Sequence, residues 1–373
     1  MEIPYIRAVN NEWKQYKDIF AETPKVKEIH LGGGTPTFFS PNNLLILLER
    51  LFKELDLAPD CELSFEGHPN STTKEHLRNL YDIGFRRMSL GIQDFDPKVQ
   101  EIVNRIQTFD TVKRATLLAR DMGYTSINHD LIYGLPLQTL TSVQDTINKI
   151  GQLMPDRIAF YSYAHVPWLK PGQRKFTELD LPSDEVKRNL YETGRAMLEN
   201  MGYKEIGMDH FALETDSLYK AAMGGTLHRN FMGYTPSHSA MTIGLGTSAI
   251  SDTWNAFAQN VKKVEEYLSL VKQAIPVFRG HILTDEDMIL RKHILNIMCQ
   301  YRTDWSDPAL QTKTLYEALP RLTELVDDEL VIIEGAKLEV TEAGKAFIRN
   351  ICMAFDARIW ASQPGTLLFS KTI

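Results

Sequence analysis

The sequence predicts an α/β protein in which short strands and amphipathic helices alternate along the first two-thirds of the chain. Candidate strands begin at residues 26, 61, 87, 125 and 157, a spacing typical of βα units that wind a parallel sheet. A helix-to-strand junction also recurs at Gly84, Gly123 and Gly202, where glycine ends a helix and an aromatic residue starts the next strand. This periodicity leaves an open sheet and a barrel as alternatives, but in both the strands' carboxyl ends carry the function.

The strands are predicted from β-branched runs, and the helices from apolar stripes and caps. Ser40 and Pro41 supply a cap and a first-turn proline, and Thr72 with Glu75 forms a capping-box pattern. The predicted strands are 26–31, 61–66, 87–91, 125–130 and 157–161, and the predicted helices include 6–20, 44–55 and 110–122.

The pattern of predicted elements changes near residue 283, where the alternation of strands and helices ends. We therefore predict a first domain of residues 1–282 and a second of residues 283–373. Helical segments (287–298 and 310–324) precede a hairpin (330–340) and a last helix, an order similar to a winged-helix unit. Because the chain is acidic, a packing or lid role is favoured over DNA binding.

Composition excludes several classes of function. With a net charge of −7 the chain has no excess of Lys and Arg to neutralise the phosphates of a nucleic acid. The longest aliphatic run (44–48) is too short to cross a membrane. The three cysteines, Cys61, Cys299 and Cys352, form no local metal motif and favour a cytoplasmic, reducing compartment. The ten scattered histidines likewise predict no protein-built zinc or non-haem iron site.

Polar or glycine-rich residues follow most of the predicted strands. Three glycines at 32–34 allow a turn with exposed N–H groups, while Glu66 and Gln93 lie at the next strand ends. Alternation places Asp130 on the inward face and His129 on the opposite one, so Asp130 is the stronger functional candidate. Together these residues predict a site at the strand ends.

Ordered motifs along the chain closely resemble the oxygen-independent coproporphyrinogen III oxidase family of radical S-adenosylmethionine enzymes. They are residues 30–37 (HLGGGTPT), 64–66 (SFE), 89–95 (SLGIQDF), 103–105 (VNR), 128–136 (NHDLIYGLP), 163–165 (YAH), 207–212 (GMDHFA), 227–231 (LHRNF), 233–235 (GYT), 248–250 (SAI) and 349–353 (RNICM).

This resemblance implies a three-quarter (β/α)6 TIM-like barrel, here with its first strand missing, and a small, mostly helical carboxyl-terminal domain. It also implies that two propionates of coproporphyrinogen III become vinyl groups, giving protoporphyrinogen IX in haem synthesis. The implied cofactors are a reduced [4Fe-4S] cluster and adenosylmethionine at two sites, with a reductant as partner. A cytoplasmic monomer is expected.

The resemblance also assigns residues. Gly33 and Glu66 would contact the cluster-bound adenosylmethionine. The second molecule would be held by Gly34, Thr35, Gln93, Arg105, Asp130 and the backbone of Ala164, with a further backbone contact from Ile250. For the substrate carboxylates, Arg229, Lys170 and Arg174 are candidates.

Two features depart from the family pattern. Nothing matches the cysteine triplet Cys-x-x-x-Cys-x-x-Cys that holds the cluster, and the three cysteines present are expected to be apolar core residues instead. We therefore expect the chain as given to be inactive, truncated at its amino end by gene-start choice, cloning or incomplete sequence. The other departure is Met232, at a position where some relatives carry glutamine, which affects any side-chain hydrogen bond there.

Two other functions compete with this interpretation. One is a cluster-free tetrapyrrole or adenosylmethionine binder, or a haem carrier. The other is a barrel lyase without radical chemistry, which would need a catalytic lysine or metal set that the strand ends lack.

Overall fold

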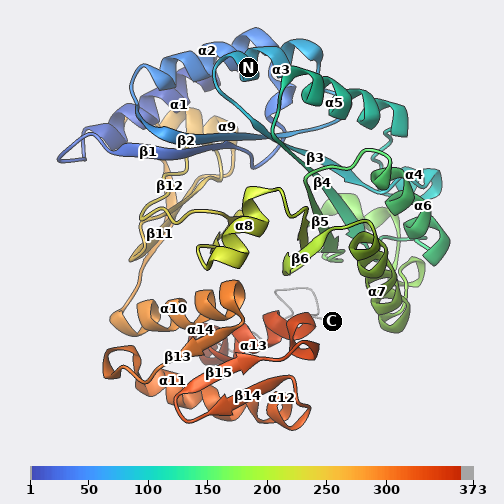
Figure 1. The fold of residues 1–373 in the computed structure, drawn as a ribbon. Coiled ribbons are helices and arrows are strands. Elements are labelled where there is room, and N and C mark those ends of the chain that lie inside the picture. Colours follow the sequence, from blue (N-terminus) through green and yellow to red (C-terminus); the bar gives the residue numbers. More distant parts are fainter. Residues whose placement is uncertain (1, 363–373) are drawn as a thin grey trace. The chain divides into compact units, whose positions relative to one another are not determined.

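The computed structural model describes residues 2–362 (Figure 1). These residues divide into two compact units. The first unit takes in residues up to 92, 107–130 and 239–283. The second unit takes in residues 93–106, 131–238 and those from 284 onward. The predicted boundary between residues 282 and 283 stays a prediction.

A seven-stranded sheet organises the chain, in the order β1-β2-β3-β4-β5-β7-β6. Strands β1 and β2, and β2 and β3, pair in parallel, whereas β7 is antiparallel to both β5 and β6. The α/β fold class is thus confirmed. The strands are β1 (Lys25–Leu31), β2 (Asp56–Gly67), β3 (Arg87–Gln93), β4 (Ser126–Tyr133), β5 (Arg157–Ser162), β6 (Lys204–Gly207) and β7 (His210–Ala212).

Helices of the first unit bury apolar stripes such as Leu48 of α2 and Leu77 of α3, both fully buried. Ser40 caps α2 as predicted, accepting a bond from the Asn43 N–H. The elements are α1 (Glu2–Lys17), the 3₁₀ turn η1 (Pro36–Phe38), α2 (Pro41–Phe52), α3 (Lys74–Asp82), α5 (Phe109–Met122), α9 (Val264–Leu270), and the antiparallel β10 (Ile250–Asp252), β11 (Ala256–Asn260) and β12 (Val277–Ile282).

The capping box predicted at Thr72 is wrong by one residue. Thr73 caps α3, with His76 as its reciprocal partner. The Thr72 hydroxyl instead donates to the His68 carbonyl (2.9 Å), because a long-range contact with Thr37 draws it into the loop after β2. The predicted left-handed glycines are confirmed, with φ of 108° at Gly84 and 97° at Gly123.

The second unit holds most of the remaining elements. They are α4 (Pro97–Ile102), α6 (Leu140–Gly151), the 3₁₀ turn η2 (Pro171–Lys175), α7 (Asp184–Asn200), α8 (Ser217–Gly224), β8 (His228–Asn230), β9 (Gly233–Thr235), α10 (Asp285–Gln300), β13 (Arg302–Asp304), α11 (Lys313–Ala318), α12 (Thr323–Asp327), β14 (Val331–Glu334), β15 (Lys337–Val340), α13 (Ile348–Ala354) and α14 (Ala357–Ser362).

The carboxyl-terminal part of this unit has its own core, which includes the fully buried Ile297, Leu315 and Ile351. The predicted hairpin is present as β14 and β15, and β13 adds a third strand that the sequence did not indicate. The helix predicted over 310–324 is interrupted by a 3₁₀ turn at Leu319–Leu322, where Pro320 lacks the N–H that an α-helix needs.

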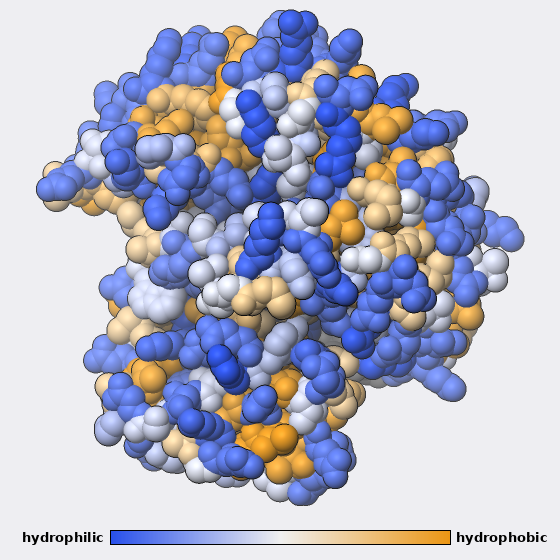
Figure 2. Space-filling model, in the orientation of Figure 1, coloured by the Kyte–Doolittle hydropathy of each residue, from blue (hydrophilic) through white to orange (hydrophobic). Residues whose placement is uncertain are grey.

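Figure 2 shows hydrophilic side chains interspersed with smaller apolar patches on the face drawn. Among the described residues, none of the helices is both long and apolar enough to span a bilayer.

Candidate functional site

An open glycine turn follows β1 in the first unit. Gly33 has a φ of 75°, which favours glycine, and an added Cβ at either Gly33 or Gly34 would meet no atom within 4 Å. Thr35 leads into the 3₁₀ turn η1, and the buried Thr37 binds the Ser71 hydroxyl (3.0 Å) in the loop after β2. The turn is therefore anchored at its base and open where backbone N–H groups could meet a ligand.

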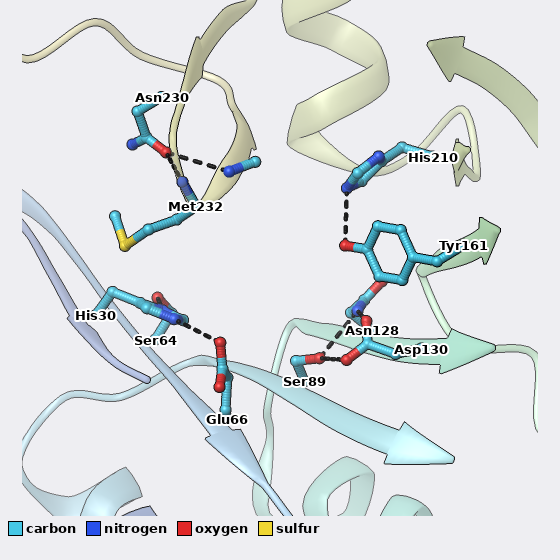
Figure 3. A network of polar contacts seen from close by, with 11 residues as sticks. His30, Ser64, Glu66, Ser89, Asn128, Asp130, Tyr161, His210, Asn230 and Met232 are labelled. Carbon is cyan, nitrogen blue, oxygen red and sulfur yellow. Dashed lines mark hydrogen bonds and ion pairs between the residues drawn. The ribbon is translucent and has the colours of Figure 1, made fainter. Parts of the chain in front are cut away.

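Glu66 stands at the end of β2 beside this turn (Figure 3). Its Oε1 lies 3.3 Å from His30 Nε2, and His30 Nδ1 lies 2.9 Å from the Ser64 hydroxyl. The Glu66 side chain remains 42% exposed, so the carboxylate can also receive hydrogen bonds from a ligand.

Asp130 belongs to a second polar group in the first unit, also drawn in Figure 3. Its two carboxylate oxygens accept bonds from Ser89 (3.0 Å) and Asn128 (2.7 Å), and Asn128 also donates to Ser89 (2.9 Å). The predicted alternation, which places Asp130 and His129 on opposite faces of β4, is confirmed by burial. An oriented carboxylate of this kind suits a ligand ammonium group.

His129 points to the other side of β4. It is fully buried, and its Nε2 lies 3.1 Å from the Thr116 hydroxyl of α5. Burial lowers the pKa of His129 to about 3, so the imidazole is neutral at physiological pH. This geometry supports the structural interpretation of His129.

Gln93, in the second unit, ends β3 in the left-handed region with a φ of 72°. Its buried Oε1 has no hydrogen-bond partner among residues 2–362. A non-glycine residue in this conformation with an unsatisfied buried amide oxygen is typical of a position that awaits a ligand.

The neighbouring Asp94 ties the loops after β3 and β4 together. Its carboxylate accepts from the Asp96 N–H (2.6 Å) and from Gln138 Nε2 (2.6 Å), while Gln138 Oε1 accepts from the Gly134 N–H (2.6 Å). Burial raises the pKa of Asp94 to about 6. This network, which the sequence analysis missed, fixes the backbone next to Gln93.

The raised pKa of Asp94 predicts a pH-dependent stability. Because the folded state holds this proton more tightly than the unfolded chain, Asp94 makes folding less favourable as pH rises from about 4 to about 6. About two pKa units correspond to about 3 kcal/mol. The unfolding free energy of wild type minus that of Asp94→Asn should therefore fall by up to about 3 kcal/mol between pH 4 and pH 7 in urea titrations. A difference that grows with pH would contradict this assignment.

Arg105 and Ala164 also lie in the second unit. Arg105 follows α4, and its N–H binds the Gln100 carbonyl (2.8 Å). The Ala164 carbonyl accepts from Gln173 Nε2 (3.0 Å), which holds the segment after β5 in place.

Ile250, in the first unit, starts β10 at the end of a loop anchored by Glu12 of α1. The fully buried Glu12 carboxylate accepts from the Gly246 N–H (2.8 Å), Asn260 Nδ2 (2.6 Å) and the Tyr267 hydroxyl (2.6 Å). Burial raises the pKa of Glu12, although the hydrogen bonds from these three donors act in the opposite direction and lower it. The backbone that leads to Ile250 is thus held from a distant part of the sequence.

Among the three candidate substrate residues, Arg229 is the most enclosed. Its guanidinium lies over the Tyr234 ring (4.6 Å to the centroid), and its Nη1 is buried without a hydrogen-bond partner in the described chain. Lys170 and Arg174 are exposed at η2, with Arg174 Nε bonded to the Pro167 carbonyl (3.0 Å).

A tyrosine and a histidine of the second unit form a further pair that sequence analysis did not assign (Figure 3). His210 Nδ1 donates to the Met208 carbonyl (2.8 Å), so its Nε2 accepts from the Tyr161 hydroxyl (3.3 Å). Burial lowers the pKa of His210 to about 4, which keeps the ring neutral.

The turn that orients His210 has two left-handed residues, Met208 and Asp209, with φ of 39° and 71°. Arg349 of α13 binds the Asp209 carboxylate (2.7 Å) and holds this turn. Burial nevertheless raises the pKa of Asp209.

Comparison with known proteins shows the family to which the chain belongs. Residues 4–150 match the model of the Radical SAM superfamily. Together with the relatives and the solved structure described next, this match shows that the chain belongs to the class of radical S-adenosylmethionine proteins.

The chain belongs to the oxygen-independent coproporphyrinogen III oxidase family. It is 37% identical over 379 residues to the oxygen-independent coproporphyrinogen III oxidase of Helicobacter pylori, covering 100% of this chain and 82% of that relative. The Escherichia coli relative of the same name is 38% identical over 358 residues, covering 94% and 78%. The solved structure of the E. coli coproporphyrinogen III oxidase, titled a radical SAM enzyme, superposes with a TM-score of 0.91 at 37% identity, covering 96% of this chain and 83% of that one.

Radical SAM membership implies adenosylmethionine and a [4Fe-4S] cluster. The open turn at Gly33 and Gly34 and the Glu66 carboxylate, all in the first unit, fit adenosylmethionine. The unsatisfied Gln93 amide of the second unit is a separate candidate contact for such a ligand. The cysteines do not fit a cluster, since the described residues contain no group of three or more metal-binding side chains. Burial raises the pKa of both Cys299 and Cys352 to about 12, which disfavours the thiolates that iron requires.

We expect this 373-residue chain to take up no stoichiometric cluster. After anaerobic incubation with iron and sulfide, iron and acid-labile sulfide in the desalted protein should remain far below four per chain. The variant Cys61→Ser/Cys299→Ser/Cys352→Ser should give the same content as wild type. A full cluster that disappears in this variant would contradict the expectation.

Proposed function

We propose that this chain provides the adenosylmethionine-binding and substrate-binding parts of an oxygen-independent coproporphyrinogen III oxidase. In that reaction, two propionates of coproporphyrinogen III become vinyl groups, and each loses carbon dioxide, one hydrogen atom and one electron. The observation that carries the proposal is the open turn at Gly33 and Gly34 beside the Glu66 carboxylate. Radical chemistry needs the cluster, whose ligands this chain lacks, so the roles assigned here are binding and orientation.

Adenosylmethionine is proposed to occupy two sites, and in this family the cluster-bound molecule would supply the radical chemistry. At one, Gly33 offers its backbone N–H to the methionine part, and Glu66 accepts from the ribose hydroxyls. The second set is proposed from the motifs that resemble the family, with Asp130 for the ammonium group and Arg105 for the carboxylate. The same motifs add Gly34, Thr35, Gln93, Ala164 and Ile250 to this second set.

The substrate proposal rests on the chemistry of a tetrapyrrole with four carboxylates. Arg229 is the favoured anchor, because its buried Nη1 lacks an acceptor that a propionate could supply. Lys170 and Arg174, being exposed, are proposed as weaker contacts. An anchored propionate of this kind would be one that is retained, since strong pairing with a guanidinium opposes loss of carbon dioxide.

Met232 stays exposed in the turn between β8 and β9, where its N–H binds Asn230 Oδ1 (2.9 Å). A thioether is only a weak acceptor, so we propose that this position contributes apolar contact with the tetrapyrrole.

Fluorescence titration with coproporphyrin III, the stable oxidised form of the substrate, tests the proposal. We expect saturable binding by the wild-type chain, and competition by haem only at higher concentration. Tight haem binding without affinity for adenosylmethionine would instead identify the haem carrier, for which no comparison gives support. A cytoplasmic location, a monomeric state, a separate reductant and the absence of nucleic-acid binding stay predictions.

A further inference from the structure

We propose that His30 is a positioning residue that aims the Glu66 carboxylate at the ribose of adenosylmethionine. This inference rests on the proposed role of Glu66 and adds a residue to which no role has been assigned.

Strand register brings the three residues of this group together. Strands β1 and β2 pair in parallel with His30 opposite Ser64, and Glu66 follows two residues later on the same face of β2. His30 therefore reaches both side chains, with its Nδ1 2.9 Å from Ser64 Oγ and its Nε2 3.3 Å from Glu66 Oε1 (Figure 3).

The chemistry of the partners fixes the direction of both bonds. A carboxylate only accepts hydrogen bonds, so His30 Nε2 carries the proton that is donated to Glu66. In the neutral ring Nδ1 is then the acceptor, and the Ser64 hydroxyl donates to it. Ser64 thus orients the imidazole of His30, and the imidazole in turn orients the Glu66 carboxylate. Outer partners of ligand-binding groups commonly act in this way.

Glu66 needs such an orienting partner. Its side chain is 42% exposed, whereas that of His30 is 21% exposed, and His30 is the one hydrogen-bond partner recorded for the Glu66 carboxylate in residues 2–362. Without His30, a glutamate at a strand end would sample several rotamers, and each ligand contact would first have to order it.

The absence of a side chain at Gly32 leaves room for the hydrogen bond between His30 and Glu66. A Cβ added there would lie 2.6 Å from His30 Nε2 and 2.8 Å from Glu66 Oε1, so any larger residue would push the two groups apart. The first glycine of the turn thus serves this hydrogen bond, whereas Gly33 and Gly34 face open space.

Calorimetric titration with S-adenosylhomocysteine, which carries the ribose but needs no iron, tests the inference in the 373-residue chain. We expect His30→Ala to weaken binding roughly tenfold, because the freed Glu66 side chain would then have to be ordered in each binding event. His30→Gln, whose Nε2 can also donate to Glu66, should recover most of that loss. Glu66→Ala should weaken binding at least as much, and the double variant no more than Glu66→Ala alone. With the 2′,3′-dideoxy analogue, wild type and His30→Ala should bind equally.

The outcomes separate the inference from the function on which it rests. If Glu66→Ala weakens binding and His30→Ala does not, the role of His30 is overturned while that of Glu66 stands. If Glu66→Ala has no effect, the proposed ribose contact itself fails. A His30→Ala loss that persists in the Glu66→Ala background, or with the dideoxy analogue, would show that His30 acts by another route. Asp130→Ala, which removes the other proposed site, serves as the control for binding there, and circular dichroism confirms that each variant is folded.

Discussion

Replacement of Glu12 by alanine should lower the free energy of unfolding by at least about 3 kcal/mol. The substitution leaves three buried donors, the Gly246 N–H, Asn260 Nδ2 and the Tyr267 hydroxyl, without their acceptor. Each buried group left unsatisfied costs about 1–3 kcal/mol. Urea denaturation followed by circular dichroism measures the loss.

Two further variants define the origin of this effect. Glu12→Gln keeps the shape and two acceptor lone pairs but turns an amide N–H towards a donor, so an intermediate loss is expected. Glu49→Ala removes an exposed glutamate and should change stability by less than about 0.5 kcal/mol. A loss below 1 kcal/mol in Glu12→Ala would show that water replaces the carboxylate and that the loop before Ile250 is not held by α1.

The second large effect is expected at Arg229. Replacement by glutamine should weaken coproporphyrin III binding roughly 30-fold, since a charged hydrogen bond contributes about 2 kcal/mol. The same change should alter the stability of the unliganded chain little, because loss of the contact with the Tyr234 ring is offset by removal of a buried Nη1 that lacks a partner. A loss of affinity without a loss of stability is typical of a residue kept for its ligand.

Fluorescence titration and thermal denaturation of the same preparations test both parts of this prediction. Arg229→Lys should recover part of the affinity, because it keeps the charge but not the planar fork. Arg302→Gln makes the same charge change at an exposed position of β13 and should alter neither quantity much. Unchanged affinity in Arg229→Gln would transfer the anchoring role to other cations.

Local sequence patterns were sufficient to predict most of the fold. Periodicity gave the strands β1 to β5, and Ser40 with Pro41 marked the start of α2, because these signals depend on neighbouring residues. The misplaced cap at Thr72 and the broken helix at Pro320 show the limit. In the first case a tertiary contact with Thr37 competes with the local pattern.

The candidate site was predictable only in part for the same reason. Alternation along β4 singled out Asp130, and the motifs resembling the family singled out Glu66. The contacts that hold the site could not be predicted from local sequence. His30 meets Glu66 only because of the register between β1 and β2. Glu12 binds the Gly246 N–H although the two residues are 234 positions apart in the sequence. The role of Asp94 was not predicted, because its partner Gln138 lies on another loop and the sequence gives no sign of their contact.

The central proposal is that this chain binds adenosylmethionine at two sites although its sequence lacks the cysteine triplet of the cluster. Equilibrium dialysis of the cluster-free 373-residue chain against radiolabelled S-adenosylmethionine tests it most directly. We expect a stoichiometry of about two per chain, falling to about one in Glu66→Ala and to about one in Asp130→Ala. A wild-type chain that binds none, or a stoichiometry that neither substitution changes, would contradict the account.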